Sequence, residues 1–216
     1  MKFESPLPEF LPTERLGTFS DGVFAVVITI LVLGIEIPSD SATTAAELLA
    51  LRDKFLHQIL IYFVSFWLIA LYWSQHHLLF SSVKQIDRPL VVLNLWFLLP
   101  ATLLPFVTQL MGTFRDEWRP VLLFGVTNLW AAFMFERMAA NVAAQPELHK
   151  STATASFARR SKLGARFFGV VMIVGVLLAL IDVKAGTALF LVMPIVYFYG
   201  FIRDPFAAGS GSTSAK

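Results

Sequence analysis

Two long stretches without a charged residue constrain this chain more than any other feature of its sequence. Leu56–Phe80 and Pro89–Phe114 contain no Lys, Arg, Asp or Glu over 25 and 26 residues. A helix needs about 20 apolar residues to cross the hydrocarbon core of a bilayer. Both stretches are therefore predicted to span a membrane.

The composition indicates that further spans accompany these two. Of the 216 residues, 56% are apolar and only 15% are charged, whereas charged residues make up about a quarter of a typical soluble domain. The apolar residues suffice for about six crossings and leave little for a soluble domain. We expect an all-α, polytopic integral membrane domain over residues 1–204, with spans at about 16–37, 56–80, 89–114, 120–144, 164–181 and 185–202.

The connections between these spans are short, with one exception. Gln145–Lys162 is rich in Ser, Thr and Ala and is predicted to be a solvated loop. By contrast, Asp182-Val183-Lys184 is so short that the last two spans must form a hairpin. Residues 205–216 have the Gly/Ser composition of a flexible tail or an added linker, and we expect no function there.

Charge counts predict the orientation and exclude several classes of protein. The side of the membrane that carries both termini has 12 Lys and Arg, and the opposite side has 5, so both termini are expected in the cytoplasm. The formal net charge of +2 and the lack of a basic block interleaved with aromatics argue against nucleic-acid binding. Without cysteine, the chain has neither disulfides nor thiolate ligands.

Ionisable residues at membrane depth cost about 2.5–3.5 kcal/mol each, so those present are candidates for function or for helix association. They are Asp21, His76, His77 and Glu136. Ser20-Asp21 heads an apolar run, which favours an N-cap.

The two histidines are neighbours in the sequence. Adjacent side chains on a helix point about 100° apart, so His76 and His77 cannot share one metal ion as an i, i+4 pair can. One could bond Asp21 and the other Asn94 or a backbone carbonyl, which would form a polar clasp among the first three helices. We favour this clasp over a proton relay or a metal site.

A second pattern lies on the first expected helix. Gly22, Val26, Thr29 and Leu33 follow i, i+4, i+7, i+11 spacing, and Ile30 borders the same stripe. Periodicity alone favours ordinary helix packing for this stripe.

These residues carry a family resemblance. The segment Arg15-Leu16-Gly17-Thr18-Phe19-Ser20-Asp21 resembles the Arg-x-x-x-Phe-Ser-Asp signature of the endosomal and lysosomal potassium-channel family, in its prokaryotic branch. The likeness extends to Trp73-Ser74-Gln75-His76-His77, to Asn94-Leu95 and to Leu104-Pro105-Phe106. It covers the first three spans, whereas the last three match in number, length and hairpin arrangement.

The resemblance implies a potassium-selective cation channel, not an enzyme, in a prokaryotic plasma membrane, with no cofactor and no soluble substrate. A chain with one signature motif is expected to form a homotetramer in the bilayer, with the first helix lining a central pore. The hydrophobic constriction would be formed by Val26, Ile30 and Leu33, and a potassium ion would pass transiently near Thr29. The residues implied to position this helix are Arg15, Phe19, Ser20, Asp21, His76, His77 and Asn94.

Elementary physics agrees with that reading of the stripe. Rings of branched aliphatic side chains close a pore by dewetting, and four Thr29 hydroxyls offer oxygen ligands to a partly dehydrated cation. At Val26 the family more often has Ile or Leu, so this ring is expected to be wider here.

Three other functions are the alternatives to a potassium channel. Proton conduction is a close alternative, since related channels support it and Asp21, His76 and His77 could assist. A secondary transporter would carry inverted repeats, and no internal repeat is seen. A membrane enzyme or haem protein would need a further ligand or nucleophile at the depth of the two histidines, and the sequence offers none.

Overall fold

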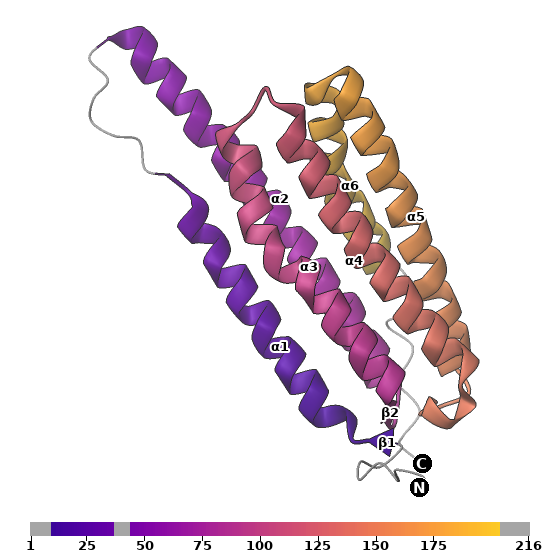
Figure 1. The fold of residues 1–216 in the computed structure, drawn as a ribbon. Coiled ribbons are helices and arrows are strands. Elements are labelled where there is room, and N and C mark those ends of the chain that lie inside the picture. The colour runs from indigo at the N-terminus through magenta and orange to yellow at the C-terminus, as the bar shows by residue number, and fades with distance from the viewer. Residues whose placement is uncertain (1–9, 37–43, 204–216) are drawn as a thin grey trace, which may run out of the picture.

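The computed structural model describes residues 10–36 and 44–203, and these form a bundle of long helices (Figure 1). The helices are α1 Thr13–Ile30, α2 Ala45–Ser81, α3 Arg88–Thr113, α4 Trp118–Ala144, α5 Thr154–Ile181 and α6 Val183–Arg203. Short 3₁₀ turns follow α1 (η1, Leu31–Gly34) and α4 (η2, Pro146–Leu148). Two-residue strands, β1 Phe10–Leu11 and β2 Ile86–Asp87, pair antiparallel.

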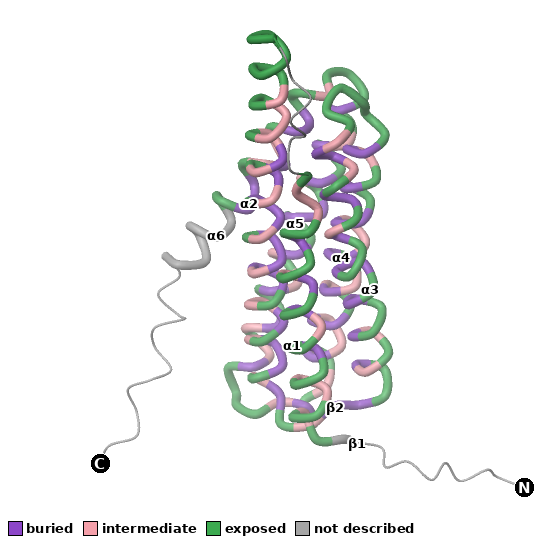
Figure 2. The backbone as a smooth tube through the Cα atoms, turned by 90° about the vertical axis from the view of Figure 1, so that its left-hand side faces the viewer, coloured by how far each residue is buried: buried purple, intermediate pink, exposed green. Residues whose placement is uncertain are grey.

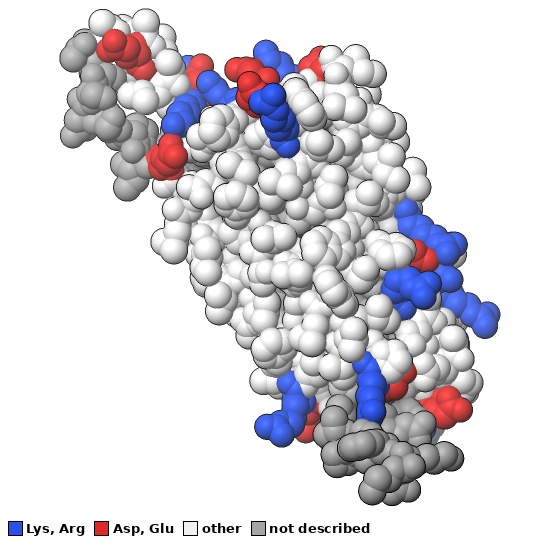
Figure 3. Space-filling model, viewed as in Figure 1, with Lys and Arg blue, Asp and Glu red and all other residues white. Residues whose placement is uncertain are grey.

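The all-α membrane class is confirmed. Five described helices, α1 to α5, are long and apolar enough to cross a bilayer, α1 together with η1, and α6 has a shorter apolar run over Val183–Val196. Lys, Arg, Asp and Glu gather toward the two ends of the bundle and toward one edge, and the broad surface between the ends is free of them in this view (Figure 3). This distribution matches a hydrocarbon layer between two polar interfaces.

Local sequence explains where several helices begin. At α2, Thr44 Oγ1 accepts from the Glu47 amide at 3.2 Å and Glu47 Oε2 accepts from the Thr44 amide at 3.0 Å, a reciprocal cap. At α3, Asp87 Oδ1 accepts from the Leu90 amide at 3.0 Å, and Pro89 occupies the first turn, where no amide hydrogen is needed.

The N-cap interpretation of Ser20-Asp21 is wrong, because α1 begins at Thr13 directly after Pro12. Both residues therefore lie about two turns inside the helix. The Ser20 hydroxyl donates to the Leu16 carbonyl at 2.9 Å, a bond that a serine can form only within a helix turn. Neither side chain therefore caps the helix, and the Ser20 hydroxyl is already bonded within α1.

The predicted loop over 145–162 is wrong in its second half, because α5 is helical from Thr154. Thr154, Ala158, Ser161 and Ala165 are all buried and recur at helical spacing. Small residues on one face let a helix approach its neighbour closely, so the composition that indicated a loop in fact forms a packing surface. Likewise, α2 begins at Ala45, about three turns before the predicted span.

The α5–α6 hairpin is confirmed. Only Asp182 separates the two helices, and its Oδ1 accepts from the Lys184 amide at 2.9 Å. Further along the hairpin, Phe190 is 1% exposed and packs where Gly125 of α4 and Gly175 of α5 leave room for its ring. The second half of the chain is therefore held by close apolar packing.

Candidate pore-lining surface

Helix α1 has two distinct faces. Phe24, Val27 and Leu31 are 1–3% exposed and belong to the apolar core shared with α2 and α3. On the opposite face, Val26 is 55% exposed and Leu33 78% exposed. Figure 2 views the bundle from the side on which α1 lies, where much of this helix is green. The predicted stripe thus faces outward from its own subunit.

The outward face combines small, polar and branched side chains. Gly22 has open space beyond its Cα, and Thr29 is exposed between Val26 and Leu33. The Thr29 hydroxyl donates within the helix, with acceptors at 2.8 Å (Val26 carbonyl) and 3.1 Å (Ala25 carbonyl). A donating hydroxyl keeps its oxygen lone pairs, so Thr29 can still accept or ligate.

An open groove runs along this face, between α1 and α3. Its volume is about 820 Å³, and it is lined by Phe19, Gly22, Val26, Ile30 and Leu33 of α1 and η1 together with Phe106 of α3. No helix of the described chain fills it. The four residues predicted to form the constriction and ion-binding stripe, Val26, Thr29, Ile30 and Leu33, are all exposed along this face.

Behind the outward face, three buried polar side chains join α1, α2 and α3. Asn94 donates from Nδ2 to Ser20 Oγ at 3.0 Å, and its Oδ1 lies 2.7 Å from His76 Nε2. Because Asn94 Oδ1 only accepts, His76 Nε2 carries the proton of this bond. The His76 ring also stacks on Phe80 at 4.2 Å. This Ser20–Asn94–His76 chain is the polar clasp, and each of its members is at most 1% exposed.

The prediction that one of the two histidines bonds Asp21 is wrong, because the bond comes from a tryptophan. Trp73 of α2 donates from its indole Nε1 to Asp21 Oδ1 at 2.8 Å, and His77 lies against the Trp73 ring at 5.4 Å. The signal available in the sequence was spacing, because Trp73 precedes His76 and His77 by three and four residues and therefore shares their side of α2. A tryptophan, which donates but never accepts, suits a carboxylate at membrane depth.

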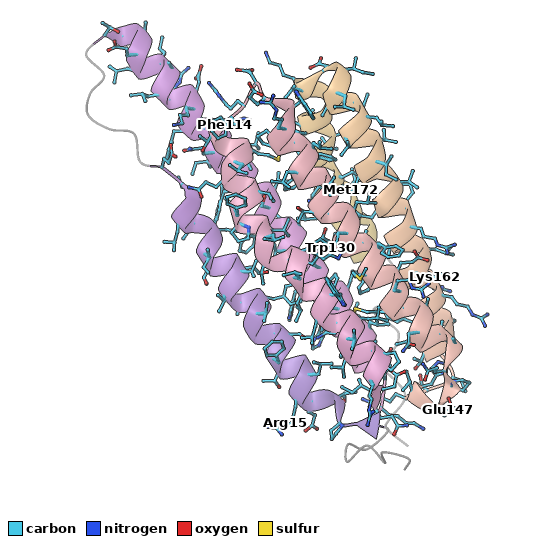
Figure 4. All side chains as sticks on the ribbon, in the orientation of Figure 1. Arg15, Phe114, Trp130, Glu147, Lys162 and Met172 are labelled. Carbon is cyan, nitrogen blue, oxygen red and sulfur yellow. The ribbon has the colours of Figure 1, made fainter. Side chains whose placement is uncertain are left out.

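Two residues of the expected positioning set lie apart from the clasp. Phe19 is 52% exposed. Arg15 is exposed at the end of α1, at the same end of the bundle as Glu147 (Figure 4), and over the described ranges it forms no hydrogen bond or ion pair. The remaining ionisable candidate, Glu136, pairs with Arg166 of α5 at 2.8 Å. In the parts of the chain that the structure describes, no three His, Cys, Asp or Glu residues cluster as metal ligands.

Parts of this chain are similar in sequence to known proteins. Residues 15–105 match the family described as Endosomal/lysosomal potassium channel TMEM175. A potassium channel of Chryseobacterium sp. (strain P1-3) is 33% identical over 121 residues, which cover 56% of this chain and 60% of that protein. The Endosomal/lysosomal proton channel TMEM175 of Homo sapiens is 34% identical over 148 residues, 62% of this chain and 28% of that protein.

The fold is also similar to a solved structure. The lysosomal potassium-selective channel TMEM175 homolog from Chamaesiphon minutus aligns with a TM-score of 0.76 and 25% identity, over 87% of this chain and 96% of that one. The matched segments span 50–60% of the length of the bacterial relatives. These relatives are channels and not enzymes. Residues 15–105 are thus similar to the family of the endosomal/lysosomal potassium channel TMEM175, and the fold over most of the chain is similar to that of a solved homolog.

Proposed function

We propose that this chain forms a passive potassium-selective channel, as a homotetramer whose central pore is lined by α1. The observation that carries the proposal is the outward stripe of Val26, Thr29, Ile30 and Leu33, which no helix of the described chain covers. Relatives named as potassium channels match the region that contains this stripe. Both termini would lie in the cytoplasm of a prokaryotic plasma membrane.

A single helix cannot enclose a pore, so the stripe needs symmetric copies to become a conduit. In a closed ring, the branched side chains of Val26, Ile30 and Leu33 would form hydrophobic constrictions that gate by dewetting. The Thr29 hydroxyls would supply oxygen ligands to a passing, partly dehydrated potassium ion. The polar clasp and the Trp73–Asp21 bond would fix the rotation of α1, so that the stripe faces the axis.

Flux through liposomes tests this proposal. Purified protein is reconstituted with a potassium gradient, and potassium flux is measured with and without valinomycin. We expect valinomycin-independent flux that prefers potassium to sodium. Leu33→Ala and Val26→Ala should increase leak and weaken this preference, because each enlarges a constriction. Leu177→Ala on the exposed face of α5 is the matched control and should behave as the native chain. Native flux and selectivity in both α1 variants would place the pore elsewhere.

Proton conduction is the second candidate, since vertebrate relatives are named endosomal/lysosomal proton channels. Asp21 is exposed on α1, five residues before Val26 of the stripe. Comparing pH-gradient flux with potassium-gradient flux in one preparation separates the two. Potassium flux without proton flux supports the leading proposal, and proton flux that Asp21→Asn abolishes supports the alternative.

A further inference from the structure

A second groove, remote from α1, opens between the beginning of α3 and the end of α4. Its volume is about 690 Å³. Two arginines line it, Arg88 from α3 and Arg137 from α4, and its remaining walls include the apolar side chains of Val92, Leu93 and Ala140. The function proposed above uses none of these residues.

The register between the two helices fixes the depth of each arginine. Asp87, the cap of α3, accepts from Asn141 Nδ2 at 3.1 Å and from Gln145 Nε2 at 2.8 Å. Arg88 therefore lies level with the last turn of α4. Arg137 precedes Asn141 by one turn, about 6 Å closer to the middle of the bundle. The groove thus has one guanidinium at its mouth and one a turn deeper, where apolar walls begin.

Two acidic groups lie near Arg137, Glu136 in sequence and Asp87 through the contact of α3 with α4, and both are engaged by other partners. Glu136 is paired with Arg166 at 2.8 Å, and the Asp87 carboxylate accepts from a backbone amide and two side-chain amides. Within the described ranges, Arg137 has no hydrogen bond or ion pair of its own. Arg137 is exposed near the membrane boundary, at the level where an anionic lipid head group can meet its guanidinium.

We propose that this groove binds the phosphate of an anionic phospholipid, with Arg88 and Arg137 on the head group and an acyl chain along Val92 and Ala140. Guanidinium groups bind phosphate oxygens through paired, charge-assisted hydrogen bonds. Basic pockets between helices at the cytoplasmic face are suited to anionic lipids, and this end is the one that the positive-inside count assigns to the cytoplasm. Val92 is 53% exposed, so lipid can reach the apolar wall. The inference does not depend on which ion the chain conducts.

Lipid binding to the delipidated, detergent-solubilised protein tests the site. Native mass spectrometry with added phosphatidylglycerol or phosphatidylcholine gives the bound fraction of each. We expect phosphatidylglycerol to bind about tenfold more tightly, because its net negative charge attracts both guanidinium groups, whereas the choline ammonium of phosphatidylcholine offsets its phosphate and repels them. Arg88→Gln with Arg137→Gln should remove this preference. Arg159→Gln with Lys162→Gln, which removes two charges from α5 outside the groove, is the matched control and should keep it.

A second variant guards against loss of folding. Ala140→Trp fills the groove without removing a charge and should weaken phosphatidylglycerol binding while the helix content measured by circular dichroism stays native. Unchanged lipid preference in both groove variants would overturn the proposal. So would millimolar inorganic phosphate that displaces the lipid completely, since the site would then serve a soluble anion. Loss of oligomer without loss of lipid preference would assign the groove to a subunit contact instead.

Discussion

The exposed faces of α1 and α5 differ in a way that tells their surroundings apart. From Phe167 to Ile181, every exposed side chain of α5 is a large apolar one. The exposed face of α1 instead mixes Asp21, Gly22 and Thr29 with Val26 and Leu33. Lipid tails are matched by uniform aliphatic surface, whereas polar and small residues at membrane depth favour protein or water. The exposed face of α5 is therefore suited to lipid, whereas the exposed face of α1 is suited to contact with protein or water.

The two helices are also attached differently. α1 is bound through the polar clasp and a few core residues, and 22% of its apolar window is buried, against 33% for α5. α5 makes close apolar contacts, since its Gly175 adjoins the Phe190 ring. Hydrogen bonds fix the rotation of a helix with little contact area, which leaves the rest of the α1 surface available for contacts outside its own chain.

The largest difference between the exposed faces of α1 and α5 is expected when a lysine is introduced on each. Ile173→Lys on α5 would place a charge in lipid, at a cost of about 2.5–3.5 kcal/mol, and should lower the yield of folded protein. Ile30→Lys on α1 should leave the yield nearly native but abolish potassium flux, because in the proposed tetramer four ammonium groups would repel cations from the pore. Yield by fluorescence-detected size exclusion and flux in liposomes check both. Equal loss of yield with unaltered flux per folded protein would mean that α1 faces lipid.

The attachment of α1 is tested at the clasp. Asn94→Ala leaves the buried His76 Nε2 without its acceptor, which should destabilise the protein by about 1–3 kcal/mol. Trp73→Phe removes only a bond to the exposed Asp21 and should cost less, about 0.5–1.5 kcal/mol. Thermal unfolding in detergent measures both. Identical midpoints for the two variants would argue against a special role for the buried pair.

Substituting one glycine on each helix by alanine tests how closely α5 and α1 are packed. A methyl group at Gly175 would collide with the buried Phe190 ring, so Gly175→Ala should destabilise by about 1–3 kcal/mol. A methyl group at Gly22 meets open space, so Gly22→Ala should not lower the unfolding midpoint and gains helix propensity of up to about 1 kcal/mol. The measurement is again thermal unfolding. A destabilised Gly22→Ala would reveal a close neighbour on the outward face of α1.

The smallest difference is expected between two ion pairs. Arg166–Glu136 joins α5 to α4 with the Glu136 side chain 16% exposed. The other pair joins Lys54 of α2 to Glu36, which follows η1, and these side chains are 40% and 46% exposed. Glu136→Gln should lower stability by less than about 1 kcal/mol, and Glu36→Gln by less still.

The contribution of the Lys54–Glu36 pair to stability should depend on pH. The hydrogen bond and charge of Lys54 hold the pKa of Glu36 below its ordinary value of 4.5. Its contribution is therefore present above pH 4.5 and is lost as the pH falls through the lowered value. Unfolding midpoints of the native chain and Glu36→Gln should differ slightly at pH 7 and converge in acid. A difference that persists in acid would assign the effect to another interaction.

Sequence patterns predicted some parts of the site well and others poorly. The sequence predicts that Val26, Thr29 and Leu33 share one face of the first helix, because helical periodicity alone groups them. The sequence predicts a contact between Asn94 and one of the two adjacent histidines, because polar residues are few in the first three spans and must satisfy one another. The structure shows that this histidine is His76. The Trp73–Asp21 bond was missed because an indole reads as apolar in a composition count. The early start of α5 was missed because Ser, Thr and Ala suit both loops and close helix contacts.

By itself, the sequence determined that this chain is a membrane-embedded helical bundle, because charge-free runs of bilayer length have no other stable environment. It also determined which residues share a face of α1, since the helical period is fixed by backbone geometry. Only the tertiary structure decided that this face points away from the subunit's own core and that Arg88 and Arg137 share a groove. Rotation and register depend on contacts between residues far apart in the chain, such as Ser20 with Asn94 and Asp87 with Asn141, and no local pattern encodes them.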